Sequence, residues 1–140
     1  PLIIGVDATV PGFIHSDGTA GWDIDRLIAP VGLLARYAQL PFRNEPLVIP
    51  AETFEQTRVT LTLAPKFGKP ALPQSANVAT QYGTFSSQFS LAATLTGTQL
   101  HFSRMLDLRA NLVPPSGYGA FRSFGEVVDN QDHLRITGND

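Results

Sequence analysis

The chain has 140 residues, of which 43% are hydrophobic and 16% are charged, and its net charge is −2. Such a composition is typical of a folded chain the size of one domain and not of a disordered one. The basic residues occur singly along the sequence, so neither a nucleic acid nor an anionic membrane surface is expected as a partner. No cysteine occurs, which excludes disulfides, thiolate metal sites and a cysteine nucleophile from this sequence.

The first forty residues predict one strand and one short helix. Residues 2–10 are apolar and rich in β-branched side chains, which predicts a strand that ends before Pro11. Apolar residues then recur near a helical period, but Pro30 and Gly32 oppose a long helix, so we predict a short helix over residues 31–39. The apolar stretch from Leu27 to Phe42 is shorter than the roughly 20 residues of a membrane-spanning helix, so no membrane insertion is expected.

The middle of the chain predicts strands, because apolar and polar residues alternate there. Residues 57–63 and 85–95 each place their apolar side chains on one face. Alternation resumes over residues 100–108 after a glycine at position 97, so these last two strands predict a β-hairpin. Arg104 falls on the apolar face of the last strand, and we expect either a bulge there or a place at the sheet margin with its head in water.

The C-terminal part predicts a helix and a closing strand. We expect the helix over residues 116–130, with Ser116 as its N-cap. Apolar residues recur there at three- and four-residue spacing and predict a face that packs on the sheet: Tyr118, Phe121, Phe124 and Val128. Residues 133–137 predict the last strand.

Together these elements predict a mainly β fold, an antiparallel β-sandwich-like domain with one C-terminal α-helix packed on it. We expect a single domain over residues 1–140. The sandwich core would occupy residues 40–137, which leaves residues 1–39 open as a junction with a preceding domain.

Few residues form a pattern that carries chemistry. Asp23 and Asp25 would lie on the same side of a strand, as an acid and base pair requires, and would suit a hydrolase. Together with His15 and Asp17 they are also of the types that bind metals, but their spacing matches no known metal site. We prefer a solvated surface for these residues and expect no catalytic residue, metal or cofactor in this chain.

Several C-terminal segments resemble a known pattern: Phe102–Leu108 (FSRMLDL), Val113–Pro115 (VPP), Tyr118–Phe124 (YGAFRSF), Asp132 and Leu134–Ile136 (LRI). This order of segments resembles the C-terminal β-sandwich domain of bacterial transglutaminase-like proteins. Those proteins also carry an N-terminal β-rich domain of unknown function and a central domain with Cys, His and Asp residues. The resemblance extends more weakly back to residue 40 and covers roughly two-thirds of the chain.

The resemblance implies a non-catalytic accessory domain of a larger transglutaminase-like, cysteine protease-like protein. Because the family's nucleophile is a cysteine, no catalytic residue can be assigned here. The implied role is to pack on the catalytic domain or to present substrate to it, with the neighbouring domains of the parent chain as partners. The resemblance also implies a periplasmic or otherwise exported protein.

A second reading is a free-standing carbohydrate- or peptide-binding module, because β-sandwiches often have that role. A sugar platform uses exposed aromatic rings, however, and the single Trp22 has no evident partner. For the accessory reading, the apolar stretch from Leu27 to Phe42 is the expected contact with a neighbouring domain, unless it belongs to the chain's own core. The candidates for structural or docking roles are Leu33, Leu34, Tyr37, Tyr118, Phe121, Arg122 and Phe124.

Overall fold

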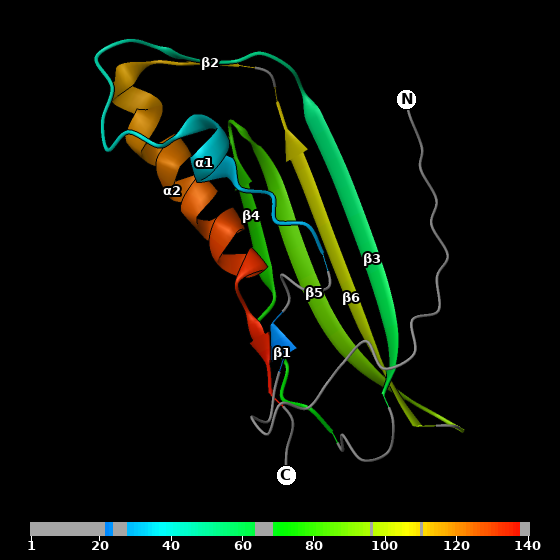
Figure 1. Cartoon of the computed structure of the whole chain (residues 1–140). Coiled ribbons are helices and arrows are strands. Elements are labelled where there is room, and N and C mark those ends of the chain that lie inside the picture. Colours follow the sequence, from blue (N-terminus) through cyan, green and yellow to red (C-terminus); the bar gives the residue numbers. More distant parts are fainter. Residues whose placement is uncertain (1–21, 24–27, 64–68, 96, 110, 138–140) are drawn as a thin grey trace.

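A computed structural model of the chain describes residues 22–23, 28–63, 69–95, 97–109 and 111–137 (Figure 1). The predicted strand over residues 2–10 lies outside these residues. The main element is a four-stranded antiparallel sheet with the order β3-β6-β5-β4. Its strands are β3 (Thr53–Leu63), β4 (Ala76–Thr80), β5 (Gly83–Thr94) and β6 (Gly97–Leu108).

The long strands follow the predicted alternation. Strand β6 pairs without interruption with β3 on one side and with β5 on the other. Strands β5 and β6 form the predicted hairpin, and β3 begins four residues earlier than predicted. Leu95 was wrongly included in the strand: it lies fully exposed in the turn. Gly97 ends this turn at a φ of 144°, where a Cβ would come within 2.8 Å of the Leu63 carbonyl oxygen.

Helix α2 (Pro115–Asp132) lies on one face of the sheet, over the side that carries β4 and β5 (Figure 1). The predicted cap at Ser116 is wrong. Pro114 is the N-cap and no side chain caps the helix, while Pro115 begins it. Proline suits this position because it has no N–H to leave unpaired and its φ is already helical. The predicted inward face is buried: Tyr118, Phe121, Phe124 and Val128.

Helix α1 (Leu33–Tyr37) packs against α2 and is shorter than the predicted 31–39. Gly32 precedes it in a left-handed conformation, with a φ of 64°. The two helices approach closely at Gly125 of α2, where an added Cβ would lie 3.1 Å from a methyl group of Leu34. A glycine that lowers helix propensity therefore permits this contact.

Two small antiparallel sheets complete the fold. Strands β2 (Leu47–Ile49) and β7 (Asn111–Val113) pair across the end of the molecule where α2 begins (Figure 1). Strands β1 (Trp22–Asp23) and β8 (Arg135–Ile136) pair near the C-terminal end of α2. Strand β8 lies within the predicted 133–137 but has only two residues, and β2, β4 and β7 were not predicted.

The mainly β, sandwich-like class with a C-terminal helix packed on the sheet is confirmed. Its second layer consists of the two helices and the short strands instead of a second large sheet. Two hydrophobic clusters fill the space between the layers. The first cluster lies under α2 and includes Phe85, Leu106 and Phe121, whereas the second lies toward the β5–β6 turn and includes Leu100 and Phe102.

Candidate functional site

A buried ion pair lies between the two hydrophobic clusters. Arg104 of β6 donates a hydrogen bond from Nη1 to Asp132 Oδ1, and the two residues are only 4% and 1% exposed. The Nη2 of Arg104 donates to the Ala29 carbonyl oxygen at 3.0 Å, and the Val31 N–H donates to Asp132 Oδ2 at 2.6 Å. The pair thus ties the central strand, the end of α2 and the segment before α1 together.

The prediction for Arg104, a bulge or a place at the sheet margin, is wrong. The pairing of β6 continues through Arg104, which lies opposite Thr57 on one side and Ser87 on the other. Its guanidinium is buried because the carboxylate of Asp132 reaches it from α2. Buried charges are retained when they are paired and hydrogen-bonded, and here the partner is 28 residues away in the sequence.

The polar layer continues on β5 and on the last turns of α2. Ser87 is fully buried; its hydroxyl donates to Gln131 Oε1 at 2.6 Å and accepts from the Ala76 N–H at 3.2 Å. Burial raises the pKa of Asp132 above its ordinary value, although the Val31 N–H and the charge of Arg104 act in the opposite direction. Most of its polar groups are hydrogen-bonded within the fold, although the buried Nε of Arg104 has no hydrogen-bond partner among the described residues, and its links between β5, β6, α2 and the segment before α1 give this layer a structural role.

The side chain of Asp129 fixes the start of α1. Its two oxygens accept hydrogen bonds from the N–H groups of Leu33 at 2.7 Å and Leu34 at 2.9 Å. These are among the N–H groups that a helix leaves without an internal partner, and the preceding Gly32 has no side chain to satisfy them. A residue nearly one hundred positions later therefore supplies the cap.

The aromatic candidates on α2 lie in the core. Tyr118, Phe121 and Phe124 are at most 2% exposed. The Tyr118 hydroxyl donates to the Leu40 carbonyl oxygen at 2.7 Å, and Phe121 packs edge to face on Tyr82 with ring centres 5.4 Å apart. These rings hold the fold together and face no open surface.

The remaining candidates lie on both helices. Leu33 is buried, while Leu34 and Tyr37 are half-buried against the first cluster. Arg122 is half-buried on α2 and forms an ion pair with Glu126, with a separation of 3.5 Å. The apolar stretch from Leu27 to Phe42 thus has two parts. Its helical part packs on the chain's own core, whereas Leu40 and Phe42 are exposed. Leu27 itself lies outside the described residues.

The acidic candidates do not assemble into a site that the structure describes. Asp23 lies in β1, whereas His15, Asp17 and Asp25 are outside the described residues. Within the described ranges, no three His, Cys, Asp or Glu residues come together as a metal site would require. No helix in those ranges has the length and hydropathy to span a membrane.

The loop 38–46, β2, β7 and the start of β3 lie at the end of the molecule where α2 begins (Figure 1), and each of them carries at least one exposed apolar residue. Val48 and Leu112 are paired across β2 and β7, and they are 62% and 58% exposed. Leu40, Phe42 and Phe54 are 54%, 70% and 65% exposed. Residues 40–45 also line a shallow hollow of about 400 Å³. We call these five residues the apolar end.

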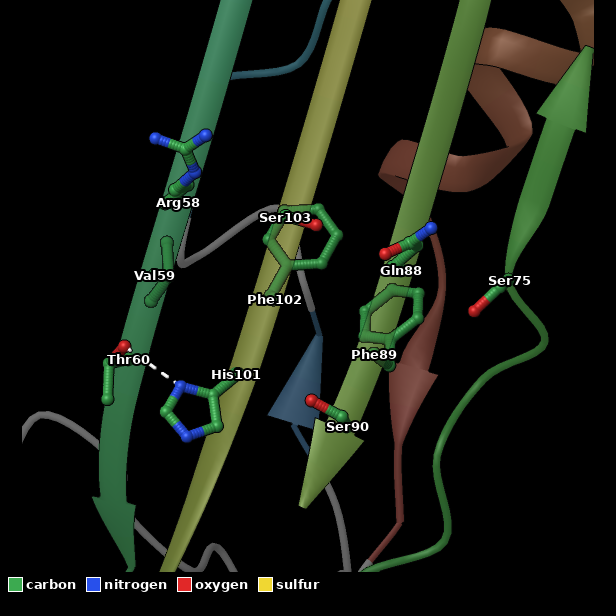
Figure 2. A pocket seen from close by; sticks show the side chains of 10 residues that line it. All are labelled: Arg58, Val59, Thr60, Ser75, Gln88, Phe89, Ser90, His101, Phe102 and Ser103. Carbon is green, nitrogen blue, oxygen red and sulfur yellow. Dashed lines mark hydrogen bonds between the residues drawn. The ribbon is translucent and has the colours of Figure 1, made fainter. Parts of the chain in front are cut away.

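A second hollow, of about 370 Å³, lies on the face of the large sheet that points away from α2 (Figure 2). Three neighbouring strands contribute most of its polar side chains, and Ser75, just before β4, contributes another. The strand residues form two rows of paired residues: Arg58, Ser103 and Gln88 in one row, and Thr60, His101 and Ser90 in the next. The hydroxyl of Thr60 and Nδ1 of His101 are hydrogen-bonded at 3.1 Å. We call this the polar hollow.

The polar hollow was not predicted, and the apolar end was predicted only in part. Alternation did predict that the polar hollow's residues share a face of the sheet, but serine, threonine and glutamine on a strand are as typical of a solvated face as of a site. Of the apolar end, Leu40 and Phe42 belong to the stretch Leu27–Phe42 that was expected to contact a neighbouring domain, whereas Val48, Phe54 and Leu112 lie outside it.

Comparison with known proteins places most of this fold in one family. Residues 25–137 match the model of a domain of unknown function, DUF3858. No curated protein and no solved structure matches the chain. The matched range contains α1, α2 and the complete four-stranded sheet. The chain therefore belongs to the DUF3858 family.

Proposed function

We propose that this chain is a non-catalytic accessory domain, and that its apolar end docks on another domain of a longer polypeptide. The observation that carries this proposal is that Leu40, Phe42, Val48, Phe54 and Leu112 are each more than half exposed and lie on elements at one end of the fold. Single exposed apolar residues are ordinary, whereas a contiguous group of them typically marks an interaction site.

The loop of the apolar end is already held in place. The buried Tyr118 donates a hydrogen bond from its hydroxyl to the Leu40 carbonyl oxygen in this loop. The Arg43 guanidinium lies 5.9 Å from the centre of the Tyr118 ring. A surface that is ordered before binding loses less conformational entropy when a partner covers it. Leu40 and Phe42 are therefore suited to act as anchors in such a contact.

We propose that the partner is a transglutaminase-like catalytic domain in the same polypeptide. The support is the resemblance of residues 102–136 to the last domain of such proteins, together with the lack of cysteine in this chain. In this proposal the neighbour performs the chemistry and DUF3858 packs on it. An exported location in the cell envelope follows from the same resemblance.

The test is to produce this chain and the neighbouring catalytic domain separately and to measure their binding by calorimetry. Phe42→Ser and Leu112→Ser are expected to weaken binding by about tenfold each, since removing a buried anchor costs more than about 1 kcal/mol. Leu95→Ser is the matched control, because Leu95 is fully exposed but lies in the β5–β6 turn. Equal binding by all three variants would contradict the proposal.

A further inference from the structure

The polar hollow has a rigid floor. Val59, Phe102 and Phe89 form the row between its two polar rows, and their side chains pack in the second hydrophobic cluster on the opposite face. Their backbone is therefore all that they contribute to the hollow. The space above it arises because short side chains, Ser103 and Ser90, lie beside longer ones.

One positive charge lies at this hollow. Arg58 is exposed and forms no ion pair with any described residue. The acidic residue on the same face of the neighbouring strand is Asp107, four residues along β6 from Ser103, or about 13 Å at the rise of a strand. The side chains that line the hollow include no acid, so its charge favours an anionic ligand.

The other lining groups are uncharged and able to donate or accept hydrogen bonds. They are hydroxyls, one amide and the imidazole of His101, whose Nδ1 is held by Thr60. In the described structure, Nε2 of His101 is therefore left to form a hydrogen bond with a ligand. The apolar lining residues, Val59, Phe89 and Phe102, pack their side chains in the second hydrophobic cluster, so a peptide would find no apolar pocket for an anchor residue. A hydroxyl-rich ligand matches this lining better.

We infer that the polar hollow binds an acidic saccharide, with the carboxylate of a uronic acid on Arg58 and the sugar hydroxyls on the serine, glutamine and histidine side chains. The planar guanidinium matches a carboxylate through two parallel hydrogen bonds. The hollow's volume lies within the range of small-ligand sites. Because no aromatic ring faces the sugar, selection rests on charge and hydrogen bonds, and a neutral sugar should bind poorly.

The experiment is an NMR titration of the 15N-labelled chain with digalacturonate, with the neutral galactose disaccharide and with sodium sulfate at matched ionic strength. Digalacturonate is expected to shift the amide signals of residues 58–60, 88–90 and 101–103. Arg58→Gln should weaken the binding about tenfold or more, as expected for the loss of a hydrogen bond to a charged group. Arg122→Gln, which removes the same charge from α2, should leave it unchanged.

Several results would overturn the inference. Equal amide shifts with the neutral disaccharide would show that Arg58 does not select the ligand. Equal shifts with sulfate would show that the hollow binds anions without specificity for a saccharide. Equal shifts with a glutamate-containing peptide would refute the saccharide class, as would the lack of any response. The hollow shares no residue with the apolar end, so this test can fail while the docking proposal stands, and the reverse also holds.

Discussion

Arg104 of β6 and Asp132 of α2 form a buried ion pair between the two hydrophobic clusters of the fold. Each charge depends on the other, because a single substitution leaves the remaining charge buried without its partner. We expect Asp132→Ala to lower the free energy of unfolding by about 3–5 kcal/mol. Denaturant unfolding of purified variants measures this. Glu55→Ala breaks the exposed pair with Arg36 and should cost under about 1 kcal/mol.

The double variant Arg104→Met with Asp132→Leu separates charge pairing from packing. Burial opposes the ionisation of Asp132, so replacing both charges by apolar side chains should recover most of the loss seen in Asp132→Ala. Denaturation of the double variant beside both single variants tests this. A double variant as unstable as Asp132→Ala would show that the hydrogen bonds to Ala29 and Val31 account for the cost.

Phe121 is expected to be a principal core residue. It is fully buried and packs on Tyr82, so Phe121→Ala should lower the free energy of unfolding by about 3–5 kcal/mol. Phe54→Ala removes the same side chain from a 65% exposed position and should cost less than about 1 kcal/mol. Urea midpoints for the two variants provide the comparison, and similar losses in both would contradict the placement of Phe121.

Two glycines of α2 are expected to respond oppositely to alanine. Nothing lies within 4 Å of a Cβ added at Gly119, so Gly119→Ala should stabilise the protein by about 0.5–1 kcal/mol through helix propensity. A Cβ at Gly117 would lie 2.7 Å from the hydroxyl of Tyr82, which donates to the Gly117 carbonyl oxygen. Gly117→Ala should therefore destabilise. Thermal melts of the two variants measure the difference. An equal rise in melting temperature for both would refute the close contact between a Cβ at position 117 and the Tyr82 hydroxyl.

Asp129 is expected to act as a cap for α1 from a distance. Asp129→Ala removes the acceptor of two N–H groups and should cost about 1 kcal/mol. Hydrogen exchange at Leu33 and Leu34 should speed up in this variant, whereas Asp129→Asn, which keeps one acceptor oxygen, should lie between it and the unchanged chain. Unchanged exchange at both amides would show that α1 does not depend on this cap.

How much the sequence predicted depended on the length of each pattern. Alternation over seven or more residues predicted β3, β5 and β6, and aromatic spacing predicted α2. Strands β2 and β7 have three residues each, which is too few to display a period. The role of Arg104 depends on Asp132, and nothing in the spacing of the two residues indicates that they meet.

The apolar end could not be separated from the core by composition. Leu33 and Phe42 belong to one apolar stretch, yet Leu33 is buried and Phe42 is 70% exposed. The difference arises because α1 ends at Tyr37 and the chain then turns past Tyr118 toward β2. Only the tertiary structure distinguishes these two environments.

The central claim is that the apolar end is a docking surface, and hydrogen exchange tests it most directly. The amides of residues 40–48 and 111–113 are compared in the isolated chain and in the parent polypeptide that carries the catalytic domain. Docking predicts slower exchange in both segments within the parent, while the β5–β6 turn around Leu95 stays unchanged. Equal exchange of residues 40–48 and 111–113 in both proteins would contradict the docking account.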